Sequence, residues 1–172
     1  MLITDREEYL RIWDMVYERL GFEPSYDHRG HSMEVPLPFD IRERYSVYAT
    51  DGLPVDKIDE LYKKMTSVLA DITPAGGKVY ALDWQHSLFL FDPRDKEDMK
   101  TVYVEDEKYS GGGYYAYFPE FLPDGDYYFF IAEDFSFGWL GHPWRQEIWV
   151  FGEKLLAFME ENYKTLGFEK LV

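Results

Sequence analysis

Two pairs of acidic and imidazole side chains are the residues of this chain best suited to chemistry. Asp83 stands three positions before His86, and Asp134 stands eight positions before His142. An imidazole titrates near neutral pH and a carboxylate can orient it, so such a pair suits general acid–base catalysis. Asp83, His86, Asp134 and His142 are therefore the candidate catalytic residues, on the condition that the two pairs meet in the fold.

Three tryptophans lie close to these pairs and are the candidate binding residues. Trp84 follows Asp83 directly, and Trp139 and Trp144 flank His142. An exposed indole such as Trp139 can stack on a sugar ring or anchor a protein partner. Aromatic residues make up 19% of the chain, however, so most of them are expected in the core.

The polar residues also have a structural interpretation, which we favour. His142 can hydrogen-bond to backbone and fix the turn before Pro143, and Asp83 can cap a turn or satisfy a buried N–H. Polar groups with perturbed pKa values serve structural networks as well as active sites. The presence of these residue types therefore does not by itself indicate an enzyme.

Other chemistries are not favoured by the sequence. The chain has no cysteine, no Gly-x-Ser-x-Gly motif and no phosphate-binding glycine motif, which excludes thiol catalysis and disfavours nucleotide binding. His28 and His31 have a spacing that could chelate a metal ion, but no second pair or local carboxylate cluster completes a site. We expect a solvated loop there, and neither a bound metal nor a cofactor.

The charge of the chain is strongly negative. Asp and Glu number 33 against 18 Lys and Arg, which gives a formal net charge of -15. Such a chain repels phosphate groups, so we expect no binding to nucleic acid or to an anionic membrane, whereas a basic protein remains a suitable partner. The excess of acid can also serve solubility alone.

Length and hydropathy predict one soluble domain. A chain of 172 residues suits a single core, and no Pro/Gly/Ser-rich linker divides it. No apolar run approaches the ~18 residues that span a bilayer, and the first residues do not resemble a signal peptide. Together with the absence of cysteine, these features predict a cytoplasmic protein.

The segment from 122 to 163 organises the expected fold. Large apolar or aromatic side chains occupy both faces of Tyr127–Ala132 and of Glu147–Phe151, as is typical of central strands covered on both sides. Between them we expect an ordered loop of 12 residues, Glu133–Trp144, which carries Asp134 and His142. A helix follows the second strand.

The rest of the chain predicts two more helices and several short strands. One helix begins at a capping box of Thr4 and Glu7 and ends at Gly21, and another follows Pro54. The two segments on either side of residues 84–86 form either one bent strand or a hairpin. The predicted fold is α+β, a single domain with a largely antiparallel sheet of about five or six strands packed by three helices. The further expected strands are Met33–Leu37, Ile41–Ala49, Lys78–Trp84, Ser87–Phe91, Thr101–Val104 and Tyr114–Phe118.

Several short motifs in fixed order carry a family resemblance. They are Ala81-Leu82-Asp83-Trp84-Gln85-His86, Pro123-Asp124-Gly125-Asp126-Tyr127-Tyr128, Asp134-Phe135, Gly141-His142-Pro143-Trp144 and Val150-Phe151-Gly152-Glu153. With its opening Trp-containing helix, the chain resembles the bacterial family catalogued as domain of unknown function 2716. The resemblance spans nearly the whole chain, residues 92–117 being a local elaboration. It implies a single domain and supplies no mechanism.

Two functions from different classes follow from these observations. The first is a non-enzymatic interaction protein, of the immunity or regulatory kind, whose acidic surface binds a basic partner. The alternative is a small-molecule-binding protein or hydrolase built on the Asp/His residues. A flat acidic face favours the first function, and a concave pocket that holds His86 and His142 favours the second.

Overall fold

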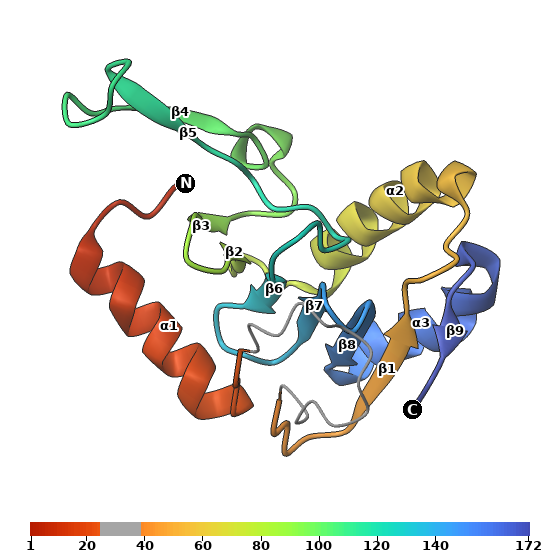
Figure 1. The fold of residues 1–172 in the computed structure, drawn as a ribbon. Helices are drawn as coiled ribbons and strands as arrows, with labels where there is room; N and C mark the ends of the chain where they lie inside the picture. The colour runs from red at the N-terminus through yellow and green to blue at the C-terminus, as the bar shows by residue number, and fades with distance from the viewer. Residues whose placement is uncertain (25–38) are drawn as a thin grey trace.

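The computed structural model describes residues 1–24 and 39–172. The described residues form three α-helices, a large antiparallel sheet and a separate two-stranded hairpin (Figure 1). The helices are α1 (Arg6–Leu20), α2 (Val55–Ile72) and α3 (Glu153–Leu166), with a short 3₁₀ turn at Lys96–Asp98. The strands are β1 (Tyr45–Ala49), β2 (Val79–Asp83), β3 (Leu88–Phe91), β4 (Val102–Glu105), β5 (Gly113–Ala116), β6 (Tyr128–Ala132), β7 (Gly138–His142), β8 (Glu147–Phe151) and β9 (Glu169–Lys170).

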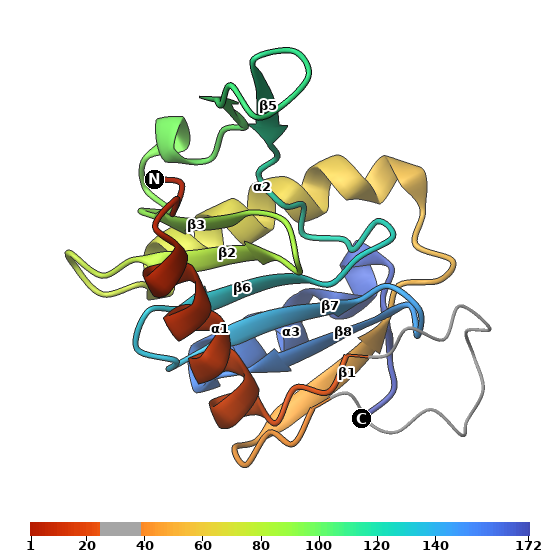
Figure 2. The same cartoon turned by 60° about the vertical axis from the view of Figure 1, so that its left-hand side comes forward.

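Seven strands make up the large sheet, in the order β3-β2-β6-β7-β8-β1-β9, and every neighbouring pair is antiparallel. Helix α1 crosses one face, while α2 and α3 cover the other (Figure 2). The predicted α+β class and the three helices are confirmed. The sheet is larger than expected because β7 and β9 belong to it.

The two faces of the sheet contribute to two apolar clusters. Alternation along β6 turns Phe129 toward the cluster that contains the buried face of α1, and Phe130 toward the cluster of α2 and α3. Trp149 on β8 is 3% exposed and belongs to the α1 cluster. The core position expected for Trp149 is therefore confirmed.

The first helix begins one residue later than the sequence pattern indicated. Asp5, rather than Thr4, is the N-cap, and its carboxylate accepts a hydrogen bond from the backbone N–H of Glu8 at 2.9 Å. Both Thr and Asp are common N-cap residues, and the presence of Glu7 three positions after Thr4 favoured the wrong one. At the other end, Gly21 ends the helix in the left-handed region, as expected.

The prediction of a 12-residue loop at 133–144 is wrong, because residues 138–142 form strand β7 in the middle of the sheet. Glycines such as Gly138 and Gly141 are common in turns, which favours a loop over a strand in this segment. Both instead allow close packing: a Cβ on Gly138 would lie 2.2 Å from the ring of Phe151, its partner across the ladder. The actual connection from β6 to β7 is a tight turn in which Phe135 N–H donates to the carbonyl of Ala132.

The β2 and β3 segments form a hairpin, which resolves the two possibilities left open by the sequence. Gln85 adopts a positive φ of 66° in the turn between them. The outer edge of β3 is paired in turn with the start of the chain. Leu2 bridges Phe89, and Ile3 N–H donates to the carbonyl of Leu88.

The second hairpin, β4 with β5, projects away from the sheet above the β2–β3 edge (Figure 1). Its strands agree with the predicted segments 101–104 and 114–118 to within two residues at each end. The predicted strand at Met33–Leu37 and the histidines His28 and His31 lie outside the described residues. Within residues 1–24 and 39–172, no helix has both the length and the apolar character that crossing a bilayer requires.

Candidate functional site

Asp83, His86 and Asp126 meet at one end of the sheet. The Nδ1 atom of His86 lies 3.1 Å from Oδ1 of Asp83 and 3.4 Å from Oδ2 of Asp126. Asp83 is the last residue of β2, and the β2–β3 turn returns His86 to it, with His86 N–H donating to the Asp83 carbonyl at 3.0 Å. Asp126 lies in the segment before β6. It comes close to Asp83 because Tyr128, the first residue of β6, pairs with Asp83 across the ladder.

This cluster lies in a cavity of about 660 Å³. We call it the acidic pocket. The β2–β3 turn and the segment before β6 form one side, and the β4–β5 hairpin forms the other. Its lining includes three aspartates and five tyrosines, and among the described residues that line it there is no lysine or arginine. Its ionisable lining residues are Asp83, His86, Asp124, Asp126, Tyr109, Tyr114, Tyr115, Tyr117 and Tyr128.

Burial and crowded negative charge dominate the electrostatics of the acidic pocket. Burial raises the pKa of Asp83 to about 6, even though the neighbouring His86 acts to lower it. The pKa of Asp126 is also raised, mainly by burial. Burial together with the charges of Asp83, Asp124 and Asp126 raises the pKa of Tyr128 to about 12. An added positive charge would therefore be favoured here.

The tyrosines of the hairpin side remain accessible. Tyr115 and Tyr117 are 59% and 65% exposed, and Tyr109 and Tyr114 are also exposed. The strand leaving the hairpin is tied to the cluster, because the Ser87 hydroxyl donates to the Tyr117 carbonyl at 2.6 Å. The rings thus line the same cavity as the aspartates, on a backbone that is attached to the β2–β3 turn.

His142 lies at the same end of the sheet but on its other face. Alternation along β2 and β7 directs Asp83 toward the α2–α3 face and His142 toward the α1 face. The imidazole is fully buried against Tyr127. The structure therefore brings Asp83 and His86 together and leaves His142 apart from them.

The hydrogen bonds of His142 define its tautomer. Its Nδ1 accepts from the backbone N–H of Arg145 at 3.2 Å, which leaves Nε2 protonated and 3.4 Å from the Tyr127 hydroxyl. Burial, with the nearby charge of Arg145, lowers the pKa of His142 to about 3. The neutral imidazole is thus a structural link between β7 and the residue before β6.

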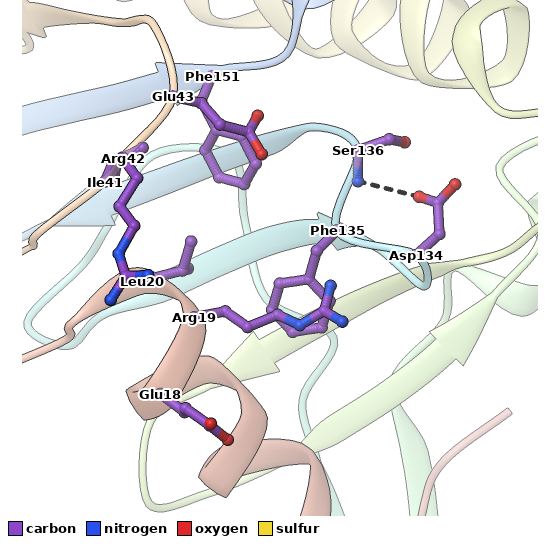
Figure 3. A pocket seen from close by; sticks show the side chains of 10 residues that line it. All are labelled: Glu18, Arg19, Leu20, Ile41, Arg42, Glu43, Asp134, Phe135, Ser136 and Phe151. Atoms are coloured by element: carbon purple, nitrogen blue, oxygen red, sulfur yellow. Dashed lines mark hydrogen bonds between the residues drawn. The ribbon is translucent and has the colours of Figure 1, made fainter.

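Asp134 lies away from both histidines, in the β6–β7 turn at the opposite end of the sheet. Its carboxylate accepts from the Ser136 backbone N–H at 2.9 Å, and hydrogen bonding to Ser136 lowers its pKa. Figure 3 shows this turn beside a cavity of about 410 Å³, where Arg19 stacks on the ring of Phe135. The expected meeting of the two Asp/His pairs does not occur.

The three candidate tryptophans are placed in or against the core. Trp139 is fully buried, and its indole N–H donates to the Phe121 carbonyl at 2.7 Å. Trp84 is 7% exposed and donates to the Tyr17 hydroxyl at 2.9 Å. Trp144 is partly buried against the α1 cluster. The ring of Trp139 is therefore not available to a surface ligand.

Sequence reasoning missed Asp124, Asp126 and the tyrosines of the acidic pocket. Asp126 lies 40 positions beyond His86, and the antiparallel register of β2 with β6 brings them together. A usable signal was present, because Asp124 and Asp126 belong to a turn that precedes a central strand. The exposed tyrosines could have been noticed as a cluster around the glycines 111–113.

Comparisons with known proteins give the relationships of the chain. A family model described as "Protein of unknown function (DUF2716)" matches residues 3–156. The "Uncharacterized protein YxiI" of Bacillus subtilis (strain 168) is 33% identical over 156 residues, which cover 88% of this chain and 87% of that protein. No solved structure matches. Because the match covers most of the chain and agrees with the motifs above, the chain belongs to the DUF2716 family.

Proposed function

We propose that this chain is a non-enzymatic cytoplasmic protein that binds a basic protein partner, whose lysine or arginine side chain enters the acidic pocket. The observation that carries the proposal is the composition of that pocket. Three aspartates and five tyrosines line one cavity, and its described lining contributes no lysine or arginine. The net charge of -15 also favours a positively charged partner.

Aromatic rings and carboxylates together favour an organic cation. A lysine or arginine head over a tyrosine face gains about 0.5 to 2 kcal/mol, depending on how far it is desolvated. Asp124 is exposed at the pocket and can pair with the same head group. Tyrosine is also common at the energetic centre of protein interfaces, because it buries much area and loses few rotamers.

The alternative of a small-molecule-binding protein or hydrolase has less support. It required His86 and His142 to share a concave pocket, but His142 is fully buried on the α1 face and does not line the acidic pocket that contains His86. Asp83 with His86 forms one acid–base pair, without the second pair that the hydrolase hypothesis assigned to the same site. A binding role uses the exposed tyrosines as well as the aspartates.

A peptide titration tests this proposal. A fluorescein-labelled peptide rich in lysine and arginine should bind the full chain, and a glutamate-rich peptide of the same length should not. Asp124→Asn should weaken binding about three- to fivefold, as expected for a partly exposed ion pair. Glu107→Gln is the matched control, since it removes one charge from an exposed residue of the hairpin turn outside the pocket.

The two variants separate a specific site from a general charge effect. The proposal fails if Asp124→Asn and Glu107→Gln weaken the basic peptide equally. Tyr115→Ala should also weaken binding, by about two- to fivefold through loss of its cation–π contact. Binding by the glutamate-rich peptide would contradict the proposal directly.

A physiological partner should show the same polarity. We expect it to be net basic, and its association rate to fall as salt rises, because long-range attraction between exposed charges is screened. Stopped-flow association at two salt concentrations measures this. A partner whose association rate does not change with salt would be inconsistent with the proposed role of charge.

A further inference from the structure

We propose that Asp83, His86 and Asp126 bind one divalent transition-metal ion, such as Zn²⁺, at the base of the acidic pocket. One ligand atom from each residue lies within 4.8 Å of the other two. This site does not depend on the proposed binding of a basic partner, because the ion is held by Asp83, His86 and Asp126, whereas the peptide test uses Asp124 and Tyr115. Its three residues come from the end of β2, the β2–β3 turn and the segment before β6.

The distances suit first-row coordination. With donors about 2.0 to 2.1 Å from Zn²⁺, neighbouring donors of a tetrahedral or octahedral shell lie roughly 3.0 to 3.4 Å apart. His86 Nδ1 lies 3.1 Å from Asp83 and 3.4 Å from Asp126. An ion bound between these atoms therefore needs little rearrangement beyond an approach of the two carboxylates.

The donor set selects the class of metal. One imidazole and two carboxylates match ligands that Zn²⁺ and its first-row neighbours accept, whereas Mg²⁺ and Ca²⁺ prefer oxygen alone. Three protein ligands would leave further positions for water or another ligand from the cavity. The chain contains no cysteine, so a competing thiolate site cannot form.

The surroundings of the cluster provide a second, independent reason. Asp83 is 8% exposed and Asp126 is partly buried, and the described lining of the pocket offers them no lysine or arginine. A buried and a partly buried carboxylate that share His86 as their basic neighbour are costly when both are charged, and a cation between them offsets that cost. The turn is also preorganised, because Asp83 N–H donates to the Ser87 carbonyl at 2.8 Å and His86 N–H donates to the Asp83 carbonyl.

Calorimetric titration of the full chain with zinc chloride, after removal of metals by chelator, tests the site. We expect one Zn²⁺ per chain in the parent. His86→Ala and Asp126→Asn should each lower the affinity about tenfold or more, since even residues that only support a metal ligand can cost that much. Asp124→Asn is the matched control, because it removes an aspartate of the same pocket that is outside the cluster.

A second control concerns the pair His28 and His31, whose spacing could also chelate. The double variant His28→Gln/His31→Gln should retain full affinity. Loss of binding in this variant, with His86→Ala unaffected, would overturn the proposal, as would the absence of Zn²⁺ binding in the parent. Equal weakening by Asp124→Asn and Asp126→Asn would also overturn it, by indicating diffuse attraction to the acidic pocket.

Cobalt provides a readout that does not rely on heat. Co²⁺ bound by an imidazole and two carboxylates should show visible absorption distinct from that of the aqueous ion, and the bands should disappear in His86→Ala. Circular dichroism confirms that this variant is folded. Because no peptide is present in either titration, metal binding and peptide binding can fail independently. If both hold, bound metal should weaken the basic peptide, because both occupants are attracted by Asp126.

Discussion

His86 and His142 lie at the same end of the sheet, and their surroundings differ completely. Asp83 pairs with Tyr128 on β6, and Tyr128 pairs with Gly141 on β7, which places both histidines near the same end of the strands. His142 is fully buried, whereas the side chain of His86 is 65% exposed to the acidic pocket. A histidine inside the sheet is held by fixed neighbours, whereas a histidine in the turn between two strands stays accessible to a ligand.

The strand that carries His142 should show the largest loss of stability. Trp139→Ala on β7 should lower the free energy of unfolding by about 3 to 5 kcal/mol, because it empties a fully buried site and leaves the Phe121 carbonyl without its indole donor. Trp149→Ala on β8 should cost about the same. Denaturant unfolding measures both, and a change below ~1 kcal/mol would contradict the central placement of these strands.

His142→Gln should remove an acid dependence of stability that the matched variant His86→Gln retains. The folded-state pKa of His142 is depressed from 6.5 to about 3, so the unfolded chain binds the proton more readily between these values. Stability from the neutral imidazole is complete above about pH 6.5 and is lost as the pH falls toward 3. The loss should reach about 3 kcal/mol at pH ~4.5.

The two glutamine variants separate this effect from simple loss of contacts. At neutral pH, His142→Gln should cost about 1 to 3 kcal/mol through unmade buried hydrogen bonds. It should then lose less stability on acidification than the parent, because glutamine does not titrate. Urea unfolding of parent, His142→Gln and His86→Gln at both pH values checks this, and an unchanged acid dependence in His142→Gln would contradict the assignment.

Asp134→Ala should have a smaller effect, confined to the turn at the far end of the sheet. Its carboxylate accepts one backbone hydrogen bond, from Ser136, which contributes about 0.5 to 1.5 kcal/mol. Binding of basic peptide and of Zn²⁺ should be unchanged. A loss of either binding in folded Asp134→Ala would show that this turn communicates with the acidic pocket.

His86→Ala should have the smallest effect on stability, within about 0.5 kcal/mol, because the side chain is mostly exposed. His142 should therefore be required for stability, and His86 for metal binding alone. A thermal melt of metal-free protein measures this effect. A shift as large as that of His142→Gln would remove the distinction between them.

Local patterns were sufficient for most of the fold. The helical stripes, the end of α1 at Gly21 and the apolar strands β6 and β8 follow from residue types within single segments. Strand β7 could not be recognised in this way, because glycine, as at Gly138, is more typical of turns than of strands. Position 138 requires glycine because a side chain there would collide with the ring of Phe151, which lies 13 positions further along the chain.

The candidate site was predictable only where it is local. Asp83 and His86 are three positions apart, so they could be proposed as a pair, although the sequence left a bent strand or a hairpin open at this point. The contribution of Asp126 depends on the register of β2 with β6, and the separation of His142 depends on which face β7 presents. Both are properties of the assembled sheet, and neither is encoded in any one segment.

The pairing of residues 1–3 with β3 has a consequence for self-association. A free strand edge exposes unpaired N–H and C=O groups that can recruit an edge of another molecule. Here Leu90 N–H donates to the Met1 carbonyl and Ile3 N–H donates to Leu88, which occupies the outward groups of β3. At the opposite edge, β9 is only two residues long. The sheet thus offers neither edge as a long template for edge-to-edge aggregation.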